Sequence, residues 1–205
     1  MNPLSPSTSP ASDLDAVLAA VQALPPQALS AVVQAALARL RPPVVSVVAR
    51  SGTGKTTFLE ALVRELMGRG LRVGVLKHHA HPTPFDTPGK DTYRLAEAGA
   101  AVVIGVGPVE VAVFRREGGA ERVDAVITRE AAGLDLVLTE GYRRGPYPKI
   151  ELHRSTRSDT LLCQADELLA LVSDRRWLLA VPQFGWEDTA GVADFLVAWR
   201  AGHRG

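Results

Sequence analysis

The sequence predicts an α/β fold in which helices cover both faces of a largely parallel sheet. Along residues 44–205, short apolar runs typical of buried strands alternate with patterns of helical periodicity, which favours parallel strands joined by helices. The first apolar run, 44–48, leads directly into residues 49–57, ARSGTGKTT, and a helical pattern follows. A small-residue loop between a strand and a helix is the setting of a phosphate-binding loop, so residues 44–205 are predicted to form a P-loop NTPase domain.

The N-terminal part of the chain lacks this alternation. Residues 1–12 are rich in Pro and Ser and show no apolar periodicity, so we expect a disordered leader. Residues 13–41 are predicted to form a helical hairpin, an appendage whose two helices break at a central proline pair, with Asp13 as a candidate N-cap. The uncharged stretch 16–38 is long enough to span a membrane, but the proline pair favours two short helices over one spanning helix.

Within residues 44–205 the individual elements follow from local patterns. Runs of apolar and β-branched residues between Gly, Pro or polar residues predict strands, and apolar residues three and four apart predict helices. The predicted strands are 44–48, 71–77, 101–106, 109–115, 136–139, 149–153, 168–172 and 178–181. The predicted helices are 58–67, 93–98, 123–127 and 188–199. The strand 149–153 alternates polar and apolar residues, which predicts that it is half-exposed.

Composition and charge limit the classes of function. The chain has 205 residues, of which 46% are hydrophobic, enough for one sizeable core. Its net charge of +1 gives no overall attraction to nucleic acid or to an anionic membrane, so neither is expected as a partner. Cys163 is the only cysteine, which excludes an internal disulfide, and no secretory signal pattern begins the sequence. We therefore expect a cytoplasmic protein.

The phosphate-binding loop supplies most of the candidate site residues. Gly52 and Gly54 let the backbone bend so that its N–H groups face phosphate oxygens, and the following helix adds its positive end. Lys55 can reach the β- and γ-phosphates as a catalytic residue, and the Thr56 hydroxyl can hold Mg²⁺. Ala49 replaces the usual first glycine, a small change unless its φ is strongly positive. Further nucleotide contacts are expected from the neighbouring loop residues Arg50, Ser51, Thr53 and Thr57.

A carboxylate at the end of a buried strand is the second part of the predicted site. The strand 136–139 lies between Asp135 and Glu140, and either acid alone could be an ordinary surface residue. A strand advances about 3.3 Å per residue, so the two acids lie roughly 16 Å apart. If this strand runs parallel to 44–48, Glu140 lies at the phosphate-loop end and Asp135 at the opposite edge. We therefore predict that Glu140 acts in catalysis and, with Thr56, in Mg²⁺ binding, directly or through a water.

Other polar residues near strand ends allow more than one interpretation. His78, His79 and His81 are typical metal-ligand types, but no cluster of Cys or carboxylates completes a site. Asp91 lies beyond a strand end, where ligands collect in such sheets, and it is either part of a nucleotide-sensing switch or part of a solvated turn. Asp174 follows a later strand and either accepts hydrogen bonds from a guanine base or serves as a loop or cap residue.

Several arginines offer planar guanidinium donors that can bind ligands. The residues Arg143, Arg144, Arg154 and Arg157 could bind phosphate or a pterin ring, and each could equally serve surface solubility. Arg50, at the second position of the phosphate loop, could reach the nucleotide of a partner subunit as an arginine finger. The simpler interpretation of Arg50 is an exposed loop arginine.

The order of these motifs resembles that of a known family. After the phosphate loop comes Lys77-His78, and then the segments PGKDTYR, AEAGA, EGY, PKIE and HR, which begin at residues 88, 96, 140, 148 and 153. The series extends from about residue 44 to about residue 199 and resembles the molybdopterin-guanine dinucleotide biosynthesis protein B family, MobB. Residues 1–41 lie outside the resemblance.

The resemblance implies a GTP-binding accessory protein with weak GTPase activity in molybdenum cofactor biosynthesis. It implies a homodimer formed through an extended sheet, and assistance to MobA, the guanylyltransferase that joins GMP to molybdopterin. It also implies that Lys77 and His78 bind an anion. Because the sequence has no Asn-Lys-x-Asp guanine motif, the preference for GTP rests on the resemblance alone.

Three other functions stay open at the level of sequence. A small-molecule kinase needs a general base and an acceptor pocket, and no acceptor pocket is recognisable in the sequence. A metallochaperone GTPase is suggested by the histidines, and it would retain stoichiometric metal on purification. A scaffold with a vestigial nucleotide site is the third, and the intact Lys55-Thr56 pair argues against it.

Overall fold

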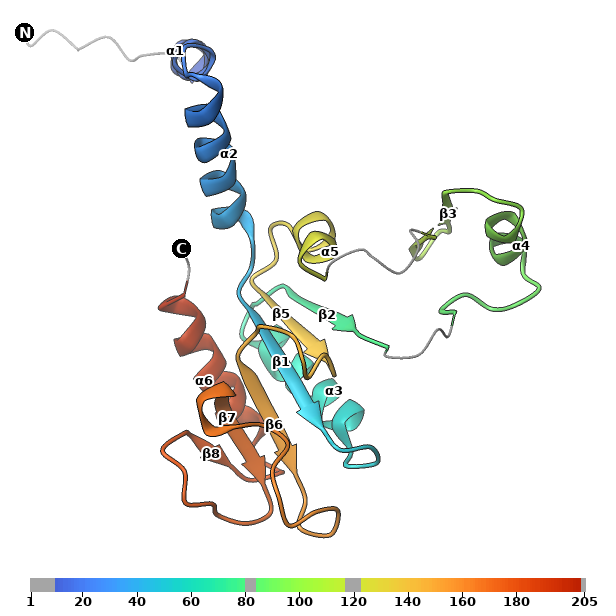
Figure 1. Ribbon diagram of the computed structural model, residues 1–205, viewed down its shortest axis with the longest axis vertical. Coiled ribbons are helices and arrows are strands. Elements are labelled where there is room, and N and C mark those ends of the chain that lie inside the picture. The colour runs from blue at the N-terminus through green and yellow to red at the C-terminus, as the bar shows by residue number, and fades with distance from the viewer. Residues whose placement is uncertain (1–9, 80–83, 117–122, 204–205) are drawn as a thin grey trace, which may run out of the picture. The chain divides into compact units, whose positions relative to one another are not determined.

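The computed structural model describes residues 10–79, 84–116 and 123–203 (Figure 1). They fall into two compact units that divide between Leu40 and Arg41. The first unit contains helices α1 (Pro10–Gln22) and α2 (Pro26–Leu40), which confirms two short helices with a break at the proline pair, of which Pro26 begins α2. Helix α1 begins three residues before Asp13, so Asp13 lies inside the helix and the prediction that it caps the helix was wrong. No helix among the described residues is long and apolar enough to cross a membrane.

The second unit is built around a six-stranded sheet in which every pair of neighbouring strands is parallel. The strand order is β2-β5-β1-β6-β7-β8, so β1 lies between β5 and β6 (Figure 1). The strands are β1 (Val44–Ala49), β2 (Val73–Lys77), β5 (Leu136–Glu140), β6 (Lys149–His153), β7 (Leu168–Ser173) and β8 (Gln183–Phe184). This order confirms the predicted parallel α/β architecture.

Alternate residues of the strands lie on opposite faces of the sheet, and apolar residues on both faces are buried. On one face, Val45 and Val47 of β1 pack with helices α3 (Lys55–Gly68) and α6 (Thr189–Ala201), which contribute Leu62 and Leu196 to the core. On the other face, Val137 packs against Ile127 of helix α5 (Val123–Glu130). A short 3-10 helix, η1 (Ala165–Glu167), precedes β7. Helices therefore cover both faces, as predicted.

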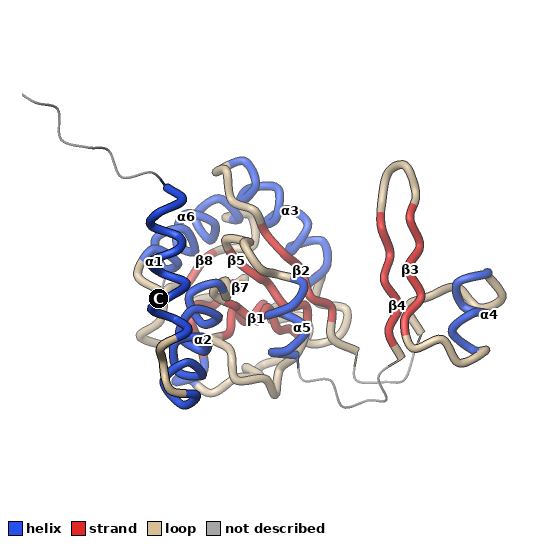
Figure 2. The backbone as a smooth tube through the Cα atoms, turned by 90° about the horizontal axis from the view of Figure 1, so that it is seen from above, coloured by secondary structure: helices blue, strands red, loops and turns tan. Residues whose placement is uncertain are grey.

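A separate two-stranded sheet lies between β2 and α5 in the sequence. Strands β3 (Val102–Val106) and β4 (Val111–Arg115) pair antiparallel, and helix α4 (Asp91–Glu97) lies next to them (Figure 2). Alternation divides this sheet into two faces, of which one includes the buried Val103. The other face carries apolar side chains that remain exposed, namely Val102, Ile104, Val106, Val111 and Val113.

Two strand predictions need correction. All five residues of β6 are buried, so the half-exposed strand predicted at 149–153 is a central strand whose polar side chains are hydrogen-bonded. The region 178–181 is not a strand. It is a loop in which Leu178 is fully exposed, while Leu179 and Val181 pack on a small cluster around Cys163. The last strand, β8, follows at Gln183.

Candidate functional site

Residues 50–54 form a tight loop between the end of β1 and the start of α3. Gly52 and Gly54 have φ values of 70° and 97°, in the left-handed region that favours glycine. The Thr53 hydroxyl is buried and donates to the Arg50 carbonyl over 2.7 Å, which closes the turn. No side chain caps the N-terminus of α3 at Gly54, so the backbone N–H groups of its first turn are available to an anion. Tyr142 is the one described non-glycine residue with positive φ, so alanine fits at position 49 without strain.

Glu140 lies beside this loop because of the register of the sheet. Val47 of β1 and Lys77 of β2 are both opposite Glu140 in the parallel pairings with β5. The Thr56 hydroxyl donates to Glu140 Oε1 over 3.0 Å, and Lys55 Nζ is 3.9 Å from the same oxygen. Lys77 Nζ is 3.6 Å from Glu140 Oε2. The structure therefore brings together four of the predicted site residues, and the parallel direction of β5 relative to β1 is confirmed.

The oxygens of Thr56 and Glu140 suit a hard cation. A hydroxyl and a carboxylate 3.0 Å apart at the N-terminus of a helix match the oxygen ligands that Mg²⁺ takes up, together with phosphate oxygens and water. The donor set therefore fits the predicted Mg²⁺ at the residues that the sequence assigned to it. Within the described parts of the chain, no group of three or more His, Cys, Asp or Glu side chains is arranged to hold a metal ion.

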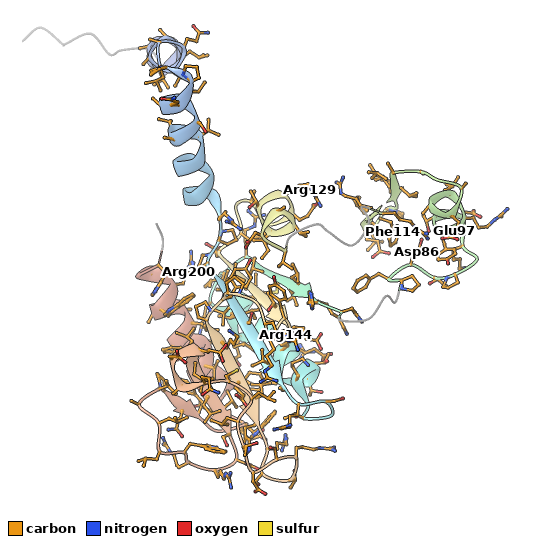
Figure 3. All side chains as sticks on the ribbon, in the orientation of Figure 1. Asp86, Glu97, Phe114, Arg129, Arg144 and Arg200 are labelled. Atoms are coloured by element: carbon orange, nitrogen blue, oxygen red, sulfur yellow. The ribbon has the colours of Figure 1, made fainter. Side chains whose placement is uncertain are left out.

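Asp135 lies at the opposite end of β5 and is engaged there. Its carboxylate pairs with the Arg200 guanidinium, and Oδ2 accepts from the Arg72 backbone N–H over 2.9 Å. Figure 3 shows Arg200 on α6 at the end of the sheet away from the phosphate loop. Asp135 thus joins the last helix to the start of β2, which is a structural position.

The remaining predicted residues are distributed as follows. The His78 ring packs against Tyr142, with ring centres 4.7 Å apart, and its backbone N–H donates to the Glu140 carbonyl over 3.2 Å. His79 packs edge-on against Phe85, and His81 lies outside the described residues. Asp91 is the first residue of α4, where its exposed carboxylate is 3.9 Å from Arg94. Neither Asp91 nor His79 is placed in the cluster around Glu140, and the nucleotide contact of Asp91 stays a prediction.

Asp174 follows β7 and holds the loop that comes after β6. Its two carboxylate oxygens accept from the Ser155 backbone N–H at 2.9 and 3.0 Å, and Oδ2 also accepts from the Ser155 hydroxyl at 2.8 Å. These hydrogen bonds, with the backbone N–H contributing most, hold the pKa of the Asp174 carboxyl below its usual range. Asp174 also lines a hollow of about 350 Å³ at the ends of β7 and β8, together with Arg176 and Gln183.

A second hollow, of about 310 Å³, lies directly beside the phosphate loop. It is lined by Gly54 and Thr57 on one side and by Arg154 and Trp186 on the other. Arg154 Nε donates to the Thr53 carbonyl over 3.2 Å, and its guanidinium carbon lies 3.8 Å from the centre of the Trp186 ring. Trp186 is held in turn by a 2.9 Å hydrogen bond from its indole N–H to the His153 carbonyl. The Arg154–Trp186 pair was not predicted, since its members are far apart in the sequence.

His153 connects the strand ends around these hollows. The ring is buried, and Nε2 donates to the Ser158 carbonyl over 2.8 Å, which leaves Nδ1 to accept from the Ser173 hydroxyl at 3.1 Å. Ser173 Oγ also accepts from the Arg175 backbone N–H at 3.2 Å. This network links the ends of β6 and β7. It also fixes the loop that follows β6, which lies beside the phosphate loop.

Comparison with known proteins identifies the family. Residues 44–174 match the family model of molybdopterin guanine dinucleotide synthesis protein B, MobB. The chain belongs to this family. The match begins at the first residue of β1, which agrees with the predicted start of the resemblance.

Curated relatives and solved structures of the MobB family cover most of the chain. The molybdopterin-guanine dinucleotide biosynthesis adapter protein of Escherichia coli is 36% identical over 163 residues, which cover 77% of this chain and 93% of the relative. The probable adapter protein of Bacillus subtilis is 33% identical over 172 residues, covering 79% and 96%. The crystal structure of Bacillus subtilis MobB superposes with a TM-score of 0.61 at 27% identity, covering 76% of this chain and 96% of that chain.

Proposed function

We propose that this chain is a GTP-binding accessory protein with weak GTPase activity in molybdenum cofactor biosynthesis. In this role it would assist the conversion of molybdopterin to its guanine dinucleotide form in the cytoplasm. The observation that carries the nucleotide part of the proposal is the convergence of Thr56 and Lys55 on Glu140 at the mouth of the phosphate loop. The relatives are adapter proteins of molybdopterin-guanine dinucleotide biosynthesis, which supports the pathway.

The proposed phosphate site uses residues that already lie together. The backbone N–H groups of the loop and of the first turn of α3 would hold the phosphate oxygens. The loop residues are Arg50, Ser51, Gly52, Thr53 and Gly54. Lys55 would turn from Glu140 to the β- and γ-phosphates, and Lys77, also beside Glu140, would add an anion contact. An anion contact from His78 rests on the family resemblance. When bound, Mg²⁺ would supply charge neutralisation at these phosphates, with the Thr56 hydroxyl and Glu140 carboxylate as its protein ligands.

For the guanine base we propose the hollow that Asp174 lines. Asp174 Oδ1 accepts one hydrogen bond, from the Ser155 backbone N–H, and retains lone-pair capacity for an N–H group of the base, whereas Oδ2 already accepts two. Arg176 and Gln183 on the same hollow offer further polar contacts. The preference for GTP over ATP rests on the family, and a competition titration of the two nucleotides with Mg²⁺ tests it: equal affinity would contradict it.

The apolar face of the β3–β4 sheet supports a homodimer. Ile104 and Val106 are 60% and 78% exposed, and the register places them opposite Val113 and Val111 on the same face. A two-stranded sheet with an uncovered apolar face is marginal alone, and a second copy that extends or covers it would bury this surface.

Replacing Ile104 by Asp is expected to convert the dimer to a monomer, because the new carboxylate would be buried unpaired in the interface. Sedimentation equilibrium measures the change. Leu178→Asp is the matched control, since Leu178 is a fully exposed apolar residue on a loop of the larger sheet. A wild-type monomer, or an Ile104→Asp variant that remains dimeric, would contradict the assignment of this face.

The proposed protein partner is a MobA-like molybdopterin guanylyltransferase, with molybdopterin itself as a further ligand. An adapter that carries a phosphate loop is expected to bind its partner in a nucleotide-dependent way. We therefore expect the tagged chain to co-purify with such a guanylyltransferase, more strongly with GTP and Mg²⁺ than with GDP. Purified partners that show no association under either condition would contradict this part of the proposal.

A further inference from the structure

The loop of residues 154–160, which follows β6, packs against the phosphate loop through three arginines. Arg154 Nε donates to the Thr53 carbonyl over 3.2 Å. Arg50, from the phosphate loop itself, donates through Nη2 to the Thr160 hydroxyl over 3.1 Å. The third is Arg157, whose guanidinium lies at Gly52: a β-carbon at that glycine would be 3.5 Å from Arg157 Cζ and from Nη2.

These three guanidinium groups differ in how their donors are used. Arg154 is bound to the Thr53 carbonyl and stacked on Trp186, and Arg50 is bound to Thr160. The Arg157 guanidinium makes no hydrogen bond and no ion pair with any residue in 10–79, 84–116 or 123–203. It therefore presents up to five N–H donors next to the middle of a loop built to hold phosphate.

The loop that carries Arg157 is fixed on both sides of this residue. On the N-terminal side, Asp174 accepts from the Ser155 backbone N–H and hydroxyl, at 2.9 and 2.8 Å. On the C-terminal side, the buried His153 ring donates to the Ser158 carbonyl over 2.8 Å. The Arg157 backbone N–H donates to the Arg154 carbonyl over 2.9 Å, which closes the turn between the two anchors. The backbone position of Arg157 is therefore set by the ends of β6 and β7, and its guanidinium lies at Gly52.

We propose that Arg157 contacts the γ-phosphoryl group of the bound nucleotide as an arginine finger supplied by the same chain. This inference rests on the proposed GTP site. It differs from the interpretation of Arg50 as the finger, because the Arg50 guanidinium is held by Thr160 while that of Arg157 faces Gly52. Asp174 and His153 are positioning residues in this arrangement, since they act on Arg157 through the loop.

The chemical role follows from the charge that develops in hydrolysis. The oxygen of a water bonds to the γ-phosphorus, and the bond from that phosphorus to the bridging oxygen breaks with its electron pair going to GDP. The proton of the attacking water passes to the released phosphate or to solvent. A planar guanidinium beside the loop stabilises the negative charge on the transferred group and on the bridging oxygen. The Lys55 ammonium group supplies a second positive charge, from the first residue of α3.

The test uses the full chain with Arg157→Ala, Arg157→Lys and the control Arg64→Ala. Arg64 lies on the same α/β unit, is exposed on α3 and pairs only weakly with Glu60, at 3.9 Å. The measurements are affinities for GTPγS and GDP with Mg²⁺, single-turnover GTP hydrolysis and the thermal midpoint.

For Arg157→Ala we expect GTPγS affinity to fall about tenfold to a hundredfold while GDP affinity changes less than about threefold, and hydrolysis to slow about a hundredfold or more.

Arg157→Lys separates charge from geometry. Lysine keeps the charge without the planar fork, so we expect most of the GTPγS affinity to remain while hydrolysis still slows at least about tenfold. This variant also carries the test if Arg157→Ala fails to fold. Hydrolysis and GTPγS affinity equal to those of Arg64→Ala would overturn the role of Arg157 and leave the GTP site intact. Wild-type protein that binds neither nucleotide would instead refute the proposed function itself, and this inference with it.

Discussion

The Lys55→Ala variant is expected to lose about a hundredfold in affinity for GTP with Mg²⁺ and to keep the thermal midpoint of the wild type. Lys55 is the first residue of α3, and its ammonium group is partly exposed, 3.9 Å from Glu140. A charge-assisted contact to phosphate in a closed site contributes about 1.5–3 kcal/mol, which corresponds to roughly tenfold to a hundred-and-fiftyfold in affinity. Lys55 is not a member of any apolar cluster in the described parts of the chain, so folding should not change.

Titration calorimetry measures the loss, and Arg64→Ala on the same helix is the matched control. The Arg64→Ala substitution removes one positive charge from α3, and the Arg64 side chain is 75% exposed. The control variant should bind GTP as the wild type does. Full GTP affinity in Lys55→Ala, with a normal thermal midpoint, would show that residues 50–56 are not the phosphate site.

Replacing Glu140 by Gln should remove most of the Mg²⁺ dependence of nucleotide binding. Glutamine has nearly the same shape and can still accept the 3.0 Å hydrogen bond from Thr56, but it cannot supply the negative charge that a hard cation requires. We expect the Mg²⁺ concentration needed for half-maximal GTP binding to rise about tenfold or more, and hydrolysis to slow. Lys55 and Lys77 both lie within 4 Å of Glu140, so the variant also leaves these two cations without their carboxylate.

Asp135→Asn is the matched change at the other end of the same strand. It leaves the Arg200 guanidinium, whose side chain is 12% exposed, without its charged partner. We expect a loss of about 1–3 kcal/mol in the free energy of unfolding and no change in Mg²⁺-dependent binding. Denaturant titration and calorimetry on the two variants measure both properties. A Mg²⁺ defect in Asp135→Asn with none in Glu140→Gln would reverse the assignment of the two acids.

The parts of the site that could be predicted from sequence are those set by local spacing or by strand direction. The phosphate loop is contiguous, and its two glycines are where the backbone needs positive φ. Glu140 could be separated from Asp135 because side chains at the two ends of one strand must lie at opposite edges of a parallel sheet. Both inferences need only neighbouring residues and the direction of one strand.

The parts that could not be predicted depend on partners distant in the sequence. Polar residues alternate along β6, which indicates exposure, yet Glu151 is buried because its carboxylate accepts from the backbone N–H groups of Leu162 and Cys163 at 2.7 and 2.9 Å. The apolar residues at 178–181 resemble a strand, but two of them pack on a side cluster without strand pairing. The position of Arg157 at Gly52 likewise depends on Asp174, which lies 17 residues further along the chain.

Titration of the wild-type protein with GTP, in the presence of Mg²⁺ and again with EDTA, tests the central claim most directly. The account predicts saturable binding of one GTP per chain that weakens at least about tenfold when Mg²⁺ is removed, because Thr56 and Glu140 then lose the cation that links them to the phosphates. GTP that fails to bind, or that binds equally well in EDTA, would contradict a nucleotide site built from the phosphate loop and Glu140.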